Sequence, residues 1–231
     1  SAKGNKFNIR KAMKQDYKIW ILLAVFLFLG VFNICHHEMW RDEIQAWLIA
    51  KNSIHISDVF ENLRYDGHPA LWHLLLFFVT RFDVSPFAMQ ILHLSIAVFT
   101  VFVFLKHSPF SLLHKSLFIF GYFPFYEYAV ISRSYILGML FVFLFCAYYR
   151  HLPKKIILLS IFLFLLCQTH IFGLIIALCL APVMLVSAFD RKKINTLTTE
   201  IKTKIIVGLF IIGSGIFLGL IQMIPPADSG F

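Results

Sequence analysis

The residues best suited to chemistry lie in a short polar cluster, MWRDE at 39–43, directly after the first long apolar run of the chain. A carboxylate held at such a place can take a proton from a hydroxyl acceptor, as a general base does. Asp42 and Glu43 are therefore candidate catalytic residues, and Arg41 beside them is a candidate for substrate contact. The alternative is that both acids are ordinary solvated loop residues.

A second candidate segment is RYDGHPALWHLL at 64–75. Asp66 and Gly67 predict a turn, and His68 with Pro69 predicts the start of a helix. A helix N-terminus with a histidine beside it can receive an anion such as phosphate, so we expect His68 to contact one. A simple helix-capping role is the alternative for His68, and His73 further along is expected to be a packing residue.

Two further polar sites interrupt the apolar runs downstream. In YEYAVISRSY at 126–135, Arg133 lies at a membrane boundary, where a charge is costly and is usually paired with an anion. That anion is either Glu127, in a structural pairing, or a substrate phosphate, with Tyr135 beside it. In QTHIFG at 168–173, His170 is a weaker candidate, for which a capping role is the alternative.

Metal and protease chemistry are weaker alternatives. HHEMW at 36–40 resembles the start of a zinc-protease HExxH motif, but Arg41 occupies the place of the second histidine. His36, His37 and Glu38 leave a divalent cation as an alternative, although no metal site is predicted as part of the chemistry. The sequence has no P-loop and no Gly-x-Ser-x-Gly elbow.

The composition shows which elements must position these residues. Hydrophobic residues make up 59% and charged residues 14% of the 231-residue chain, and the mean hydropathy is +0.79. Apolar runs recur throughout without strand-like alternation, which predicts an all-α, polytopic membrane protein. We expect seven spans in a single transmembrane domain over 1–231; they are 19–35, 85–105, 112–126, 134–149, 156–168, 171–189 and 205–224.

The basic residues predict the orientation. Sixteen of the twenty-one lie in four segments, 1–18, 106–115, 150–155 and 190–204, so we place these in the cytoplasm by the positive-inside bias. The formal net charge of +9 therefore reflects topology and not nucleic-acid binding, because no basic stripe with interleaved aromatics lies outside these segments. The loop 36–84, with seven of the twelve acids, then lies outside as outer loop 1.

Helical patterns continue within this outer loop. Trp40, Ile44, Trp47 and Leu48 predict the apolar face of a first amphipathic helix. Ser57 is expected to cap a second helix. The segment 69–82 has fourteen residues, about 21 Å as helix, and is too short to cross comfortably, so we predict a juxtamembrane helix.

In combination, four motifs in order resemble one family. The segments MWRDEIQAWLIAKNSI, RYDGHPALWHLLLFFVTRF, YEYAVISRSYILGML and THIFGLIIAL are similar to those of bacterial glycosyltransferases of the GT-C fold. The protein O-mannosyltransferase-like branch, which includes the lipid A aminoarabinose transferases, is the most similar. The resemblance covers roughly 20–185 and implies a multi-pass protein of the cell membrane with its active site on the outer face.

The resemblance also implies roles for individual residues. The donor would be a polyprenyl-phosphate-linked sugar and the acceptor a hydroxyl on a protein, lipid or glycan, with inversion at the anomeric carbon. Asp42 would be the catalytic carboxylate supported by Glu43, and Arg133 would bind the donor phosphate near His68. Relatives often carry an acid where this chain has Ile131, and Glu127 would substitute for it.

Two rival functions use the same features. Members of this family usually have more spans, so we expect the chain to be an N-terminal portion or to need a partner subunit. A transporter or flippase of lipid-linked sugars would share the lipid groove and the phosphate-binding arginine. An inactive scaffold subunit is the third reading. Loss of the Asp42 carboxylate would impair sugar transfer far more than transport.

Overall fold

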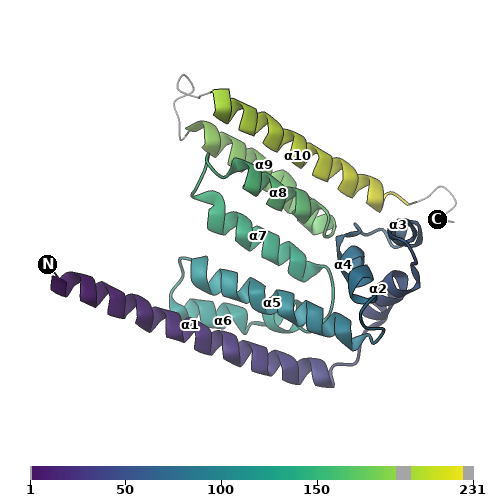
Figure 1. Ribbon diagram of the computed structural model, residues 1–231, viewed down its shortest axis with the longest axis horizontal. Helices are drawn as coiled ribbons and strands as arrows, with labels where there is room; N and C mark the ends of the chain where they lie inside the picture. The colour runs from purple at the N-terminus through teal and green to yellow at the C-terminus, as the bar shows by residue number, and fades with distance from the viewer. Residues whose placement is uncertain (1, 191–198, 226–231) are drawn as a thin grey trace.

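The computed structural model describes residues 2–190 and 199–225, and all regular structure in these ranges is helical (Figure 1). Long helices stand side by side in nearly chain order across the molecule. They are α1 (Ala2–His36), α5 (Phe87–His107), α7 (Tyr135–Tyr149), α8 (Ile156–Cys167), α9 (Ile171–Asp190) and α10 (Thr199–Met223). Three short helices, α2 (Arg41–Asn52), α3 (Ile56–Leu63) and α4 (Leu71–Val79), gather on the side of the molecule where one set of ends of these long helices lies.

A helical membrane protein is confirmed, but the prediction of seven spans is wrong. Within the described ranges, four helical segments are long and apolar enough to cross a membrane: Tyr17–His36, Phe87–His107, Ile171–Ala188 and Thr199–Met223. The apolar helices α7 and α8 are shorter, with 15 and 12 residues. Hydropathy alone gave too many spans, because an apolar run does not show how long the helix inside it is.

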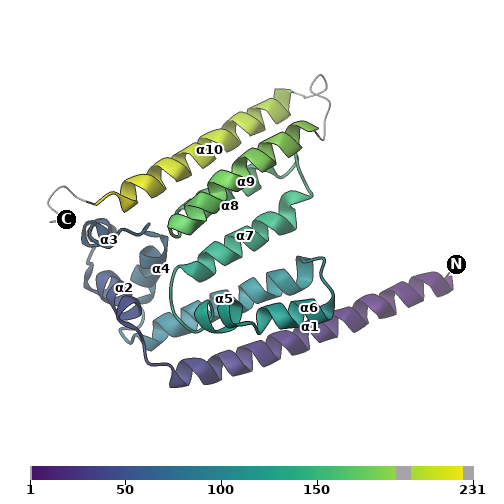
Figure 2. The ribbon, with the colours of Figure 1, turned by 180° about the vertical axis from the view of Figure 1, so that it is seen from behind.

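The predicted span 112–126 is broken into two short pieces. It contains α6 (Leu112–Ile119) and the π-helical turn η1 (Phe123–Glu127), with Gly121 between them and Pro124 inside the turn. A proline removes a backbone donor and a glycine lowers helix propensity, so the continuous helix ends there. Figure 2 shows the short α6 beside α5, which it contacts.

The two sides of the bundle on which the long helices end differ in charge. The ends of α5 and α7, with the basic segments 106–115 and 150–155, lie away from α2, α3 and α4 (Figure 1). The described part of segment 190–204 begins α10 at the same end, whereas 191–198 lie outside the described residues. This distribution agrees with the charge pattern on which the orientation was predicted, and the cytoplasmic assignment itself stays a prediction.

The short helices bury a different face than predicted. In α2 the buried residues are Glu43, Ala46, Trp47 and Ala50, whereas Trp40 and Leu48 are exposed. The predicted cap Ser57 lies inside α3; the Asp58 carboxylate instead accepts the backbone N–H groups of Ile54 and His55. The turn predicted at Asp66 is confirmed by Gly67, whose φ of +66° suits glycine.

The segment 69–82 is confirmed as a short element, since α4 has nine residues. It does not lie free on a surface, however. Trp72, His73, Leu76 and Phe77 are buried, and the helix packs against α2, α3 and α5. Residues 36–84 thus form a folded cap on the bundle, with a core continuous with that of α1, α5 and α7.

Glycines let α10 lie close to α8. A Cβ added at Gly215 would lie 2.8 Å from the Phe164 Cα, and one at Gly219 would lie 2.7 Å from the Cys167 carbonyl oxygen. Both neighbours are backbone atoms, which cannot rotate away. The α8–α10 contact therefore requires glycine at these positions.

We predict that Gly215→Ala lowers the free energy of unfolding by about 1–3 kcal/mol through overpacking. The matched control is Gly213→Ala on the same helix, where an added Cβ meets nothing within 4 Å. That control should be neutral or slightly stabilising, because alanine is the better helix former. Thermal unfolding in detergent measures both, and equal midpoints would contradict the close α8–α10 packing.

Candidate functional site

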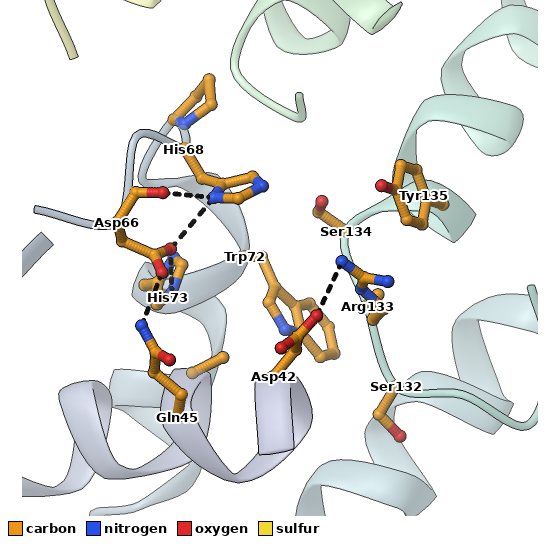
Figure 3. A pocket seen from close by; sticks show the side chains of 12 residues that line it. Asp42, Gln45, Asp66, His68, Trp72, His73, Ser132, Arg133, Ser134 and Tyr135 are labelled. Carbon is orange, nitrogen blue, oxygen red and sulfur yellow. Dashed lines mark hydrogen bonds and ion pairs between the residues drawn. The ribbon is translucent and has the colours of Figure 1, made fainter. Parts of the chain in front are cut away.

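The candidate site is built around an ion pair between residues 91 positions apart. Arg133 Nη2 lies 3.1 Å from Asp42 Oδ2, which joins the first turn of α2 to the segment before α7. Both line a cavity of about 160 Å³ together with residues of α4 and the turn before it (Figure 3). The sequence-predicted acid and arginine therefore do share one cavity.

Glu43 holds these two segments together from inside the protein. Its side chain is fully buried, and Oε1 accepts the Ser132 backbone N–H at 2.6 Å. The other oxygen, Oε2, accepts the Trp40 N–H and pairs with His37 Nε2, each at 2.8 Å. Both carboxylate oxygens are engaged, so Glu43 positions Arg133 and has no free oxygen for an incoming hydroxyl.

His93 of α5 supports the same segment from the other side. It is 1% exposed, and its two ring nitrogens lie 3.3 Å from the Ala129 carbonyl oxygen and 3.2 Å from that of Arg133. Because residues 128–134 are mostly non-helical, their backbone groups need such partners. Glu43 and His93 together fix the position of the backbone from which the Arg133 side chain extends.

The opposite wall is an Asp66–His68 pair. His68 Nδ1 donates to the Asp66 carbonyl oxygen at 2.7 Å and lies 3.2 Å from Asp66 Oδ2. Gln45 Nε2 donates to Asp66 Oδ1 at 2.9 Å, which orients the carboxylate. In Figure 3 the second ring nitrogen of His68 points toward the side of the cavity that carries Arg133.

The charges of this wall depend on one another. The hydrogen bond to Asp66 raises the pKa of His68 above its usual value, although burial opposes this. Burial would raise the pKa of Asp66, but the hydrogen bond and the charge of His68 lower it overall. Burial lowers the pKa of His73 to about 4, so His73 is neutral at pH 7. His68 is thus the histidine of this wall best able to carry a proton near neutrality.

Several buried polar atoms beside the cavity make no hydrogen bond. Within the described part of the chain, these are Trp72 Nε1, both ring nitrogens of His73 and Ser132 Oγ, although His73 Nε2 lies 3.6 Å from Asp66 Oδ2. All three residues line the cavity. Buried donors and acceptors are normally paired, so these atoms are available to a polar ligand or to water. The cavity suits a small polyhydroxylated or charged group.

An apolar groove of about 430 Å³ adjoins the cavity and shares Arg133 and Tyr135 with it. The Arg133 guanidinium lies over the Tyr135 ring, with Cζ 5.0 Å from the ring centroid. The rest of the lining comes from η1, α7, α8 and α9 and includes Phe123, Met139, Val142, Phe143, Leu166, Phe172 and Ile176. Arg133 therefore lies where a polar cavity meets an apolar groove.

His170 is at the groove and also caps a helix. Its Nδ1 accepts the Gly173 N–H at 3.0 Å, which confirms the capping role at the start of α9. Burial lowers its pKa to about 4, so the ring is neutral at pH 7. Neutral His170 then carries its proton on Nε2. The ring lies against Tyr135, with centroids 4.8 Å apart.

Other predicted site residues lie elsewhere. Arg41 faces a separate groove on α2 and α3 and does not line the cavity. Glu127 lines the apolar groove and accepts from the Tyr122 hydroxyl at 3.3 Å; the structural pairing of Arg133 is with Asp42 instead. His36 bonds the Phe32 carbonyl oxygen while His37 bonds Glu43. Among the described residues, no group of three or more His, Cys, Asp or Glu side chains could hold a metal ion.

The sequence did not identify several of the residues that build the site. Gln45, Asp66, Trp72, His73, His93 and Ser132 were not among the predicted site residues. Asp66 had the clearest signal, because it stands two residues before His68 in a predicted turn. His93 and Ser132 had none, since the His93 ring contacts a distant backbone carbonyl and the Ser132 backbone N–H donates to the distant Glu43 carboxylate.

Comparison with known proteins adds no relative. No protein-family model, no curated protein and no solved structure matches this chain.

We predict that Glu43→Gln destabilises the protein by about 1–3 kcal/mol. The amide NH2 would replace one carboxylate oxygen, and it cannot accept a hydrogen bond from the buried donor that it faces. Glu38→Gln, an exposed acid in the same loop, is the control and should be neutral. Unfolding midpoints followed by tryptophan fluorescence measure both. A Glu43→Gln protein as stable as the wild type would show that the three hydrogen bonds do not hold the site.

Proposed function

We propose that this protein is an integral-membrane glycosyltransferase. It would move a sugar from a polyprenyl-phosphate donor to a hydroxyl acceptor on the outer face of the cell membrane, inverting the anomeric carbon. The observation that carries the proposal is the place of the Asp42–Arg133 pair, between a polar cavity and an apolar groove. The order of the GT-C-like motifs along the chain supports it as well.

The donor phosphate would bind Arg133 in exchange for Asp42. The Asp42 side chain is 58% exposed, and an ion pair with such an exposed partner contributes only about 0.2–1 kcal/mol. A phosphate can take two hydrogen bonds from one guanidinium, so it competes well for Arg133. The apolar groove, which shares Arg133, would receive the first part of the prenyl chain.

The transfer would then use the freed carboxylate. The acceptor oxygen attacks the anomeric carbon from the face opposite the phosphate, and Asp42 takes the hydroxyl proton. The bond from the anomeric carbon to the phosphate oxygen breaks. Its electron pair leaves with the lipid phosphate, whose charge Arg133 and protonated His68 stabilise. The sugar would lie in the cavity beside Trp72 Nε1 and His73 Nδ1, which make no hydrogen bond.

A transporter or flippase of lipid-linked sugars is the second candidate, because the same groove and arginine would serve it. The two functions differ in their need for Asp42. Only sugar transfer requires a base at the acceptor, and removal of a general base typically costs about 10²–10⁴ in rate.

We predict that Asp42→Asn lowers sugar transfer from a radiolabelled polyprenyl-phosphate sugar at least about a hundredfold. Arg133→Ala should weaken donor binding about tenfold or more, since a charge-assisted hydrogen bond is lost. Glu61→Gln, which removes an exposed acid of the same loop, is the control. Unchanged turnover in Asp42→Asn would discard the enzyme in favour of the transporter, and undiminished affinity in Arg133→Ala would refute the phosphate site.

The raised pKa of His68 predicts a pH dependence of binding. The His68 imidazolium favours an anion, so affinity should be highest while His68 is protonated and should fall as the pH rises through its pKa, above the usual value of 6.5. The probe is a short prenyl phosphodiester, whose charge is constant between about pH 5 and 9. His68→Gln should flatten the profile. A wild-type profile as flat as that of the variant would remove His68 from the phosphate site.

A further inference from the structure

Gln222, near the end of α10, is joined by hydrogen bonds to the wall of the cavity. Its Oε1 accepts the Ala70 backbone N–H at 2.8 Å, across 152 positions of sequence. Its Nε2 donates to Gln168 Oε1 at 2.8 Å and to the Leu218 carbonyl oxygen at 2.9 Å. One side chain thus connects three separate segments of the chain.

The hydrogen bond from the Ala70 N–H to Gln222 caps the start of α4. The acceptor belongs to α10 and not to the segment 36–84. Ala70 is the residue that precedes α4 and is 1% exposed. The first N–H groups of a helix have no partner within the helix, and a buried one needs a partner elsewhere. Gln222 supplies it, and Ala70 follows directly on His68 and Pro69, both of which line the cavity. The position of His68 is therefore linked to α10.

The second hydrogen bond of Gln222 leads toward the apolar groove through Gln168. Gln168 is 8% exposed, and its Nε2 donates to the Gly215 carbonyl oxygen at 2.8 Å. It stands two residues before His170, whose ring lines the groove. The orientation of both amides is determined, because each oxygen accepts from an N–H and each NH2 donates to an oxygen. Only a carboxamide at 222 can do both.

We propose that Gln222 is a positioning residue that sets the spacing between the cavity wall at His68 and the groove wall at His170. Arg133 lies between these walls, and both pockets share it. A phosphate at Arg133 must meet His68 on one side while its lipid chain passes His170 on the other. This role rests on the proposed lipid-phosphate site.

Two readouts test the role. The first is hydrogen exchange of the peptide covering 68–76, which reports the Ala70 N–H without any substrate. The second is the affinity for the short prenyl phosphodiester, measured on the full chain in nanodiscs. Gln222→Leu removes both arms, whereas Gln222→Glu keeps an acceptor for the Ala70 N–H. Ser214→Ala is the control on the same helix, since its hydroxyl bonds only the Ile211 carbonyl oxygen.

Gln222→Leu should speed exchange over 68–76 and weaken the phosphodiester affinity about tenfold, as expected when a buried hydrogen bond is lost. Gln222→Glu should keep the protection of 68–76 but weaken the affinity as Gln168→Leu does, because a carboxylate cannot donate to Gln168 Oε1. A purely space-filling role would leave both exchange and affinity unchanged. Ser214→Ala should match the wild type. If Gln222→Leu does not fold, Gln168→Leu, which breaks only the groove arm, should leave 68–76 protected and still weaken binding.

Three results would overturn the role. They are unchanged exchange in Gln222→Leu, unchanged affinity despite faster exchange, and loss of the 68–76 protection in Gln222→Glu. If the wild type binds no prenyl phosphodiester at all, the proposed function itself fails, and the positioning role fails with it. Binding by the wild type together with equal binding by Gln222→Leu refutes the positioning role alone.

Discussion

The site depends above all on a carboxylate buried inside the protein. Glu43 is fully enclosed and accepts hydrogen bonds from the backbone of Trp40 and Ser132, and it also pairs with His37. Removing such a group from water is costly unless every oxygen is bonded, so the segments that supply the donors must stay where they are. The first turn of α2 and the segment before α7 are fixed in this way.

This constraint explains why the neighbouring acids differ so much. Asp42 and Glu43 are adjacent in sequence, but successive residues of a helix point in directions about 100° apart. Glu43 faces the core, whereas Asp42 faces the cavity and pairs loosely with Arg133. A buried, fully bonded acid is suited to holding geometry. A half-exposed acid in a weak ion pair is suited to exchanging partners during a reaction.

The cavity and the groove also draw on parts of the chain that are far from the motifs. His93 holds the Arg133 segment from α5, and Gln222 reaches the start of α4 from α10. The glycines of α10 bring that helix close enough to α8 for the second contact with Gln168. The long helices therefore act as the frame on which α2, α3, α4 and the arginine are held at a fixed separation.

The sequence by itself determined the helical membrane character, the presence of short helices within 36–84 and the candidates Asp42, His68 and Arg133, because composition and residue type are local properties. Only the tertiary structure decided which helices are long enough to cross a membrane, since a glycine and a proline end the predicted span 112–126. It also decided that Glu43 is buried and Arg41 lies outside the cavity. Such roles depend on which groups lie close together in the folded chain. A linear sequence pattern does not show that proximity.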